Sequence, residues 1–196
     1  MRTDVIEVTS TGTQMEIALS QVDKVAAYKG LTGKNALHLR LLAEEMLGMM
    51  RSITGEKDGY FWIEDEAGEY QLHLQVNTRM NLEKRDQLLK ASTTGKNEAA
   101  RGLMGRLRDF FDQGDDMPGY PLYHMDMMSE YNGTMLNWEW SMLAYQETLS
   151  KYTAKDEKAR AMWDELEKSV VTHVADDVKV AIRGQMAEMT IIKRIG

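Results

Sequence analysis

Two short runs of strand-forming residues, joined by a two-residue link, constrain the fold of this chain most strongly. The runs are "GYFWIEDE" at 59–66 and "EYQLHLQVNT" at 69–78, and Ala67-Gly68 between them has the composition of a tight turn. Alternation in the second run places four apolar side chains on one face: Tyr70, Leu72, Leu74 and Val76. His73 falls on the other face. We therefore predict a hairpin with one apolar face, which needs a layer of helices to bury it.

The clearest helical pattern in the chain occupies 35–53 and ends before Gly55. Its apolar residues recur at helical spacing: Leu39, Leu42, Met46, Met49, Met50 and Ile53. Upstream, residues 4–20 alternate between apolar and polar types, which predicts a strand or hairpin. A short apolar pattern over 22–28 then predicts a helix that stops at Gly30.

The second half of the sequence predicts helices followed by a terminal hairpin. Short helices are expected over 80–90 and 103–112, and 113–133 holds both prolines and reads as a loop. A longer helix face is marked by residues at helical spacing: Met135, Trp138, Met142, Tyr145, Leu149 and Tyr152. A second helix is predicted over 155–173, with three side chains turned inward: Met162, Leu166 and Val170. Two strand-like segments around Gly184 close the chain.

These elements predict an α/β (α+β) two-layer sandwich, in which helices cover one face of a mixed or antiparallel sheet. We expect a single domain over 1–196, with 114–175 forming a helical insertion before the terminal hairpin. No repeat of about 20–50 residues is evident.

Composition narrows the classes of function. The chain has 24 Lys and Arg against 31 Asp and Glu, a formal charge of −7, which does not suit the phosphate backbone of a nucleic acid. It has no cysteine, so thiol catalysis, disulfides and cysteine-based zinc sites are excluded. The sequence shows neither the apolar stretch of a signal peptide nor the run of about 20 apolar residues that a membrane helix needs. We therefore expect a cytoplasmic protein that binds neither nucleic acid nor membrane.

Four stretches resemble the motifs of the histidine-kinase-type ATPase fold, especially those of the small anti-sigma-factor serine kinases of bacteria. "LRLLAEEMLGMM" at 39–50 is similar to the N-box helix, "LHLQVNTRMN" at 72–81 to the first glycine box, and "RGLMGRL" at 101–107 to the second. "AEMTIIKRI" at 187–195 is similar to the closing strand of the family. The resemblance implies an ATP-binding sandwich fold and leaves 114–175 unmatched.

The resemblance implies a role for several residues of this chain. Glu45 matches the helix glutamate that activates the attacking group, but Met49 stands where the family has its Mg²⁺-binding asparagine. Asn77 matches the adenine-binding aspartate, and its amide oxygen is a weaker acceptor than a carboxylate. Gly102 matches the start of the second box, whereas Gly105 comes one residue late. We therefore predict an impaired site that holds no metal and expect no cofactor, with ATP or ADP as a possible ligand.

Three hypotheses of function follow. The leading one is a non-catalytic regulatory or protein-binding module derived from this ATPase-like fold. The alternative is an ATP-binding serine protein kinase of the anti-sigma-factor type that uses Glu45, Asn77 and Gly102. The third is a small-molecule enzyme with acid–base chemistry at His124. The sequence neighbours that could assist this histidine are Tyr123, Asp126 and Glu130.

The predicted helical insertion offers a candidate surface for a protein partner or for self-association. Its helix face carries Trp138, Met142 and Tyr145, and aromatic and methionine side chains are enriched at protein interfaces. The same side chains could instead close the insertion onto its own domain. The sequence leaves both interpretations open.

Overall fold

The computed structural model describes residues 1–9, 13–54, 58–77, 137–154, 157–167, 169–183 and 186–196. The helix predicted over 80–90 and every prediction on 103–133 lie outside these ranges, as do Gly102, Gly105 and His124.

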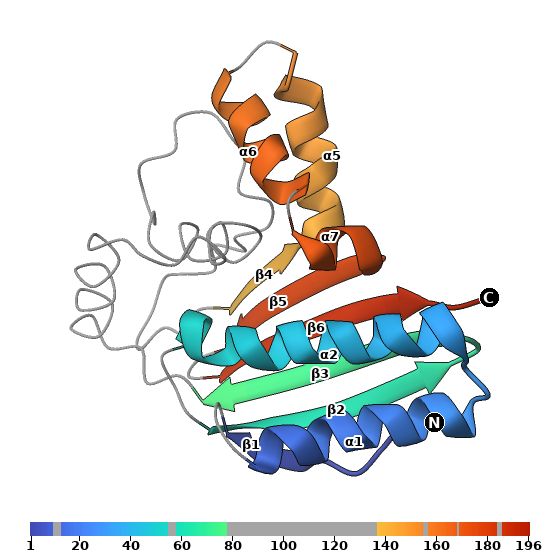
Figure 1. The fold of residues 1–196 in the computed structure, drawn as a ribbon. Helices are drawn as coiled ribbons and strands as arrows, with labels where there is room; N and C mark the ends of the chain where they lie inside the picture. The colour runs from blue at the N-terminus through green and yellow to red at the C-terminus, as the bar shows by residue number, and fades with distance from the viewer. Residues whose placement is uncertain (10–12, 55–57, 78–136, 155–156, 168, 184–185) are drawn as a thin grey trace.

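An antiparallel sheet of six strands forms one layer of the fold (Figure 1). In spatial order the strands are β1 (Ile6–Thr9), β2 (Asp58–Glu66), β3 (Glu69–Asn77), β6 (Met186–Arg194), β5 (Asp177–Arg183) and β4 (Asn137–Ser141). The helices α1 (Thr13–Tyr28), α2 (Gly33–Thr54) and α7 (Val170–Val174) pack on one face of it. The predicted α+β sandwich is therefore confirmed, and the sheet is antiparallel.

The predicted β2–β3 hairpin is present, and its turn depends on Gly68. Ala67 and Gly68 have φ values of 49° and 87°, the conformation of a two-residue type I′ turn. The Gly68 carbonyl accepts a hydrogen bond of 2.9 Å from the Ile195 amide. A Cβ at this position would lie 2.8 Å from the Ile195 carbonyl oxygen. The turn thus fixes the hairpin and also contacts the end of the chain.

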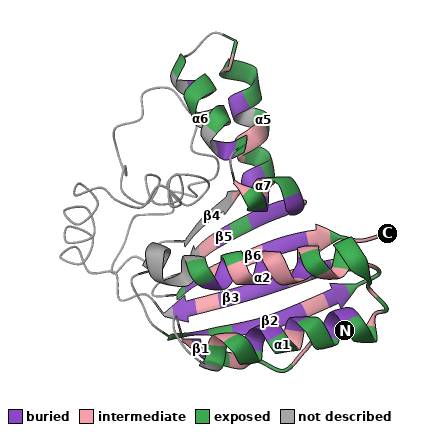
Figure 2. Cartoon of the chain, viewed as in Figure 1, coloured by how far each residue is buried: buried purple, intermediate pink, exposed green. Residues whose placement is uncertain are grey.

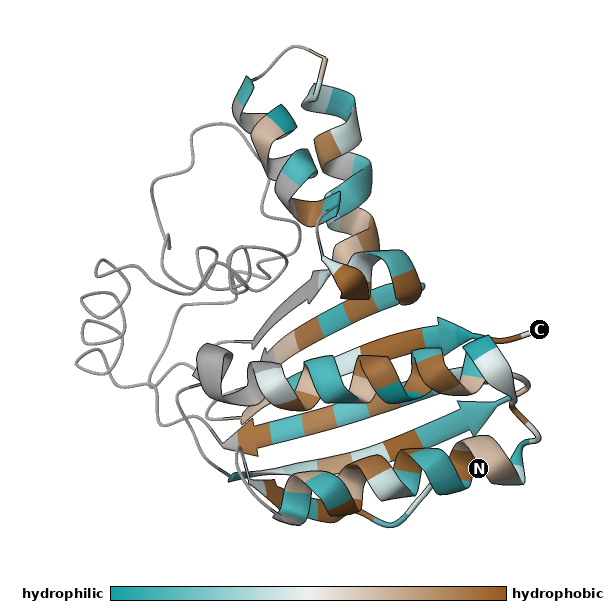
Figure 3. Cartoon of the chain, viewed as in Figure 1, coloured by the Kyte–Doolittle hydropathy of each residue, from teal (hydrophilic) through white to brown (hydrophobic). Residues whose placement is uncertain are grey.

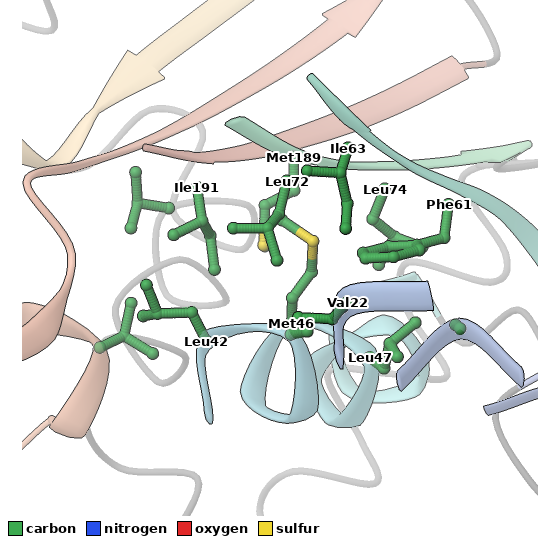
Figure 4. Close-up of a cluster of buried hydrophobic side chains, with 14 of the residues drawn as sticks. Val22, Leu42, Met46, Leu47, Phe61, Ile63, Leu72, Leu74, Met189 and Ile191 are labelled. Atoms are coloured by element: carbon green, nitrogen blue, oxygen red, sulfur yellow. The ribbon is translucent and has the colours of Figure 1, made fainter. Parts of the chain in front are cut away.

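The hydrophobic core lies between the sheet and the helices α1 and α2 (Figures 2 and 4). Brown and teal bands alternate along β3 in Figure 3, as expected for a strand with one apolar face. The largest side chains in the core are fully buried: Phe61, Ile63, Leu72, Leu39, Leu42 and Met46. Full burial of one such side chain stabilises a fold by about 1.5–3 kcal/mol.

The N-terminal strand is shorter than predicted. Among the described residues of 4–20, strand structure covers Ile6–Thr9, and the residues from Thr13 onward belong to α1. The predicted strand or hairpin over 4–20 is therefore wrong for Thr13–Ser20. The apolar residues from Ala18 onward follow helical rather than alternating spacing, because this stripe packs on the sheet. The predicted helix stop is confirmed, since α1 ends at Tyr28 and Gly30 has a φ of 68°.

The region before the terminal hairpin also differs from the prediction. Asn137–Ser141 is the edge strand β4, so Trp138 belongs to a strand, and α5 (Met142–Tyr152) begins only after it. Ser141 is the N-cap of α5, which explains why the helix cannot start earlier.

The helix predicted over 155–173 is two helices. α6 spans Glu157–Glu167, and α7 follows separately after Ser169. Leu166 is buried as predicted, but Val170 is 46% exposed and therefore does not face inward. The two strand-like segments around Gly184 are β5 and β6, as predicted.

The six strands are arranged about an approximate two-fold axis through the sheet. Each half runs strand, two helices and antiparallel hairpin, as β1-α1-α2-β2-β3 and as β4-α5-α6-β5-β6 with α7 added. The halves meet where β3 pairs with β6, and the strand order β1-β2-β3-β6-β5-β4 is symmetric about that junction. His73 pairs with Thr190 at the midpoint of the β3–β6 register. The axis therefore passes between these two residues.

Candidate functional site

A row of polar and aromatic side chains crosses the centre of the sheet on the face opposite α1 and α2. We call this surface, formed by β2, β3 and β6, the His73 face. Trp62 on β2 is the cross-strand partner of His73 on β3, and His73 is the partner of Thr190 on β6. The rings of Trp62 and His73 stack in parallel, with centroids 4.8 Å apart and an interplanar angle of 2°. This stack holds the imidazole in one orientation.

His73 is buried and only half satisfied in its hydrogen bonding. It is 8% exposed, and its Nδ1 lies 3.2 Å from Glu188 Oε1 and 3.2 Å from Thr190 Oγ1. Its Nε2 is also buried, and has no hydrogen-bond partner among the residues that the structure describes. An unsatisfied buried polar atom costs about 1–3 kcal/mol. A structural role in the sheet does not account for this cost.

Arg2 and Glu64 complete the row on the outer side of Trp62. Arg2 forms a bridge with Glu64 through the backbone, and its guanidinium lies 5.4 Å from the centre of the Trp62 ring. Glu64 Oε1 accepts a hydrogen bond of 3.1 Å from Trp62 Nε1 and lies 3.5 Å from Arg2 Nε. The cluster thus joins a cation, two rings and two carboxylates across neighbouring strands.

Exposed apolar side chains flank this cluster. Tyr60 on β2 and Met186 on β6 are 48% and 42% exposed, and the strand registers place both on the His73 face. Apart from His73, the ionisable residues that β2, β3 and β6 place on this face are five acidic ones, Asp58, Glu64, Glu66, Glu69 and Glu188, and one basic one, Arg194. The surface is therefore amphipathic, with an excess of negative charge.

A second titratable cluster ties the end of α1 to the β2–β3 hairpin. The side chain of Asp65 is only 4% exposed and forms an ion pair with Lys29. A hydrogen bond from Lys29 to Asp65 raises the pKa of the lysine. Burial, with the Asp65 charge beside it, raises the pKa of Tyr70, the cross-strand partner of Asp65. A tyrosine with a raised pKa is rarely present as the phenolate that could act as a base near neutral pH, so we assign this cluster a structural role.

The residues predicted from the ATPase resemblance are only partly described. Glu45 lies on α2 and is exposed, and Asn77 is the last residue of β3, paired with Met186. α2 packs against β3, and the C-terminal ends of both lie at the same end of the sheet (Figure 1). Gly102 and Gly105 lie outside the described residues. Within the part of the chain that the structure describes, no three acidic or histidine side chains are grouped as metal ligands would be.

The partner surface predicted on the helical insertion is wrong for Met142. This side chain is 1% exposed and belongs to the core, and Tyr145 packs against the same core while half-buried. Of the two interpretations left open, closure onto the domain therefore holds for these two residues. Trp138, predicted on the same helix face, is paired with Ile182 in the sheet.

The sequence indicated one member of the His73 cluster without its partners. Alternation along 69–78 placed His73 on the face opposite Leu72 and Leu74, as observed. The contact with Glu188 joins residues 115 positions apart in the chain, and follows only from the β3–β6 register. No local motif signals such a contact.

No protein-family model matches this chain, and no curated protein has a significantly similar sequence. Among the helices that the structure describes, none combines the length and apolar character needed to cross a membrane.

Proposed function

We propose that this chain is a non-catalytic regulatory protein that binds a protein partner through the His73 face. One observation carries the proposal: a buried imidazole, held by a ring stack, whose Nε2 lacks a partner among the described residues. Nε2 is buried, so a partner supplies this hydrogen bond only if binding moves aside the side chains that cover the atom. The new bond would then offset the cost of leaving the atom unsatisfied.

The His73 face extends across several strands, which favours a macromolecular partner over a small ligand. The cluster extends from Arg2 beside β2 to Thr190 on β6, and exposed Tyr60 and Met186 lie on the same face. Tyrosine, tryptophan, methionine and arginine are the residue types enriched at protein interfaces. The ATPase resemblance is compatible with this role, because Met49 in place of the metal-binding asparagine leaves Mg²⁺ without a hard ligand there.

Photo-crosslinking tests the proposed surface. A benzophenone amino acid at Tyr60 should capture a discrete partner in the native cell, whereas the same probe at Tyr28 serves as a matched control. Tyr28 is 78% exposed and lies at the end of α1. The partner, once identified and purified, should bind the chain in calorimetry and should bind Trp62→Ala weakly. Equal capture from both positions, or unchanged affinity in Trp62→Ala, would argue against the His73 face.

The second candidate function is an ATP-binding serine protein kinase of the anti-sigma-factor type. It is favoured by the exposed Glu45 on a helix that packs along β3, the strand that ends at Asn77. A ligand at 100 times its Kd raises the free energy of unfolding by about 2.7 kcal/mol. A thermal shift with Mg-ATP that Gly102→Trp abolishes would support this candidate. If Glu45→Gln then kept the shift but lost phosphoryl transfer, the non-catalytic proposal would be overturned.

A further inference from the structure

We infer that the hydrogen bonds of Nδ1 fix His73 as a hydrogen-bond acceptor at Nε2. We further infer that the partner of the His73 face presents an arginine or lysine side chain to this atom, and that binding moves aside the side chains that bury it. This inference rests on the binding role proposed above and adds the chemistry of the partner.

The neighbours of Nδ1 determine which ring nitrogen carries the proton of neutral His73. Glu188 Oε1, 3.2 Å from Nδ1, can only accept a hydrogen bond while it is ionised. If Nδ1 carried no proton, its lone pair would point at the carboxylate oxygen and the two would repel each other. The Thr190 hydroxyl, also 3.2 Å away, can accept as well as donate. The proton of the neutral ring is therefore held on Nδ1, and Nε2 presents a lone pair.

A lone pair on Nε2 calls for a donor, and the charges around it select a cationic one. Glu188 and Glu64 are both in the cluster, and the chain as a whole has a formal charge of −7. Arg194 of the same face is already paired with Glu69 at 2.9 Å. A carboxylate of a partner would meet both the Nε2 lone pair and this negative field. An ammonium or guanidinium group is attracted by both.

Arg2 shows within the chain itself that this face accepts a guanidinium. Its side chain lies over the Trp62 ring, 5.4 Å from the centre, and pairs with Glu64. Arginine combines a planar fork of donors with the ability to stack on aromatic rings. The ring stack of Trp62 and His73, bordered by Glu188, offers a second arginine the same combination of groups.

Nitrogen NMR of the free protein tests directly which ring nitrogen of His73 carries the proton. With ¹⁵N-labelled histidine at pH 8, where imidazole groups are ordinarily neutral, His73 should show a protonated Nδ1 and an unprotonated Nε2. Glu188→Leu removes the carboxylate and should shift the ring toward the Nε2-protonated form. Glu7→Gln, an exposed carboxylate on β1 of the same face, should change nothing. A protonated Nε2 in the unaltered chain would overturn the inference.

Binding of synthetic peptides tests the partner chemistry. Three sets of matched peptides, rich in Arg and Lys, in Asp and Glu, or in neutral polar residues, are titrated against the whole chain. We expect the cationic set to bind, and His73→Phe to weaken that binding about tenfold, because phenylalanine keeps the ring stack but lacks Nε2. Phenylalanine has the same charge as a neutral imidazole. A general attraction of cations to an acidic protein would therefore survive this substitution. Glu16→Gln, on the exposed surface of α1 and away from the His73 face, is the matched control.

The outcomes separate this inference from the proposed function. Preferential binding of acidic or neutral peptides, lost in Trp62→Ala, would overturn the cationic partner and leave the binding face in place. Cationic binding that His73→Phe leaves unchanged would also overturn the inference. If no peptide binds and the probe at Tyr60 captures no partner, both the inference and the proposed function fail. Circular dichroism and amide NMR spectra establish that each variant retains the fold.

Discussion

The two halves of the sheet share one connectivity but are covered by helices in different ways. In the first half, α1 and α2 lie along the strands and bury a continuous apolar stripe (Figure 1). In the second half, α5 and α6 extend away from the sheet, and α7 joins α2 in covering it. The strands themselves match closely, since Phe61 and Leu72 of the first half correspond to Val178 and Met189 of the second. The halves thus share a sheet framework and diverge in their helices.

The same comparison places the candidate site at the junction of the halves. The two-fold axis relates His73 to Thr190 and Trp62 to Lys179, so the first half supplies the ring stack and the second half supplies the hydroxyl. Glu188 corresponds to Gln71 in the first half. A symmetric framework therefore carries an asymmetric cluster at its centre. This is what we expect if the positions near the axis were adapted for binding, while the core positions stayed apolar in both halves.

The largest expected effect tests whether the halves share one cooperative core. Phe61→Ala should lower the free energy of unfolding by about 3–5 kcal/mol, because a fully buried ring leaves a cavity. Hydrogen exchange of the sheet amides in both halves should accelerate together. Leu149→Ala, a buried residue of α5, should loosen chiefly the amides of α5 and α6. Equal loss of protection in β2 and β3 from both variants would show that the divergent helices belong to the same cooperative unit.

A second experiment examines the contact that ties the first hairpin to the end of the chain. Gly68→Ala should destabilise by more than the roughly 1–2 kcal/mol of a left-handed residue alone, because its Cβ would meet a backbone oxygen at 2.8 Å. Gly30→Ala is the matched control, with a similar φ of 68° and nothing within 4 Å of the added Cβ. Denaturant midpoints of the two variants measure the difference. Equal midpoints would mean that Ile195 moves freely to accommodate the added methyl group.

Local patterns in the sequence were enough to predict the first half of this framework. The β2–β3 hairpin and α2 followed from residues that are neighbours in the chain, with Ala67-Gly68 as the turn and Leu39 and Leu42 as inward positions. The start of α1 was missed because Thr13–Ser20 also fits an alternating pattern, and packing on the sheet decides between the two.

The second half and the candidate site depended on pairings that are distant in the chain. β4 pairs with β5, and the intervening helices separate the two strands in sequence, so Trp138 was placed on a helix. The symmetry resides in strand order and in apolar positions, which a search for repeated residues does not detect. For the site, the outward position of His73 was predictable, but its contacts with Trp62 and Glu188 require the registers of three strands.

A smaller effect is expected at the start of α5, where the second half anchors its divergent helices. Asp177 Oδ1 accepts hydrogen bonds from the Leu143 amide at 3.0 Å and from Ser141 Oγ at 3.1 Å. Asp177→Ala should cost about 0.5–2 kcal/mol, as for the loss of a helix cap, and should raise the exchange rates of the first amides of α5. Asp177→Asn keeps one acceptor oxygen and should cost less. Unchanged exchange in α5 would place the anchor of this helix elsewhere.

The smallest expected effect is a loss of stability at alkaline pH. It concerns the first half alone, because the two groups expected to cause it, Tyr70 and Lys29, both lie there. Burial raises the pKa of Tyr70 above its ordinary 10.0, and a hydrogen bond to Asp65 raises the pKa of Lys29 above 10.5. In both cases the folded state holds its proton more tightly, so this contribution is fully present below about pH 10 and is lost as the pH rises further. Urea midpoints measured between pH 8 and pH 11.5 should therefore fall above pH 10. Tyr70→Phe removes the contribution of Tyr70 and should make the fall in the urea midpoint shallower. Tyr60→Phe, at an exposed position of β2, should leave the slope of that fall unchanged. The same alkaline slope in Tyr70→Phe and the unaltered chain would show that the ionisation of Tyr70 is not coupled to unfolding, and that the first hairpin tolerates the charge without opening.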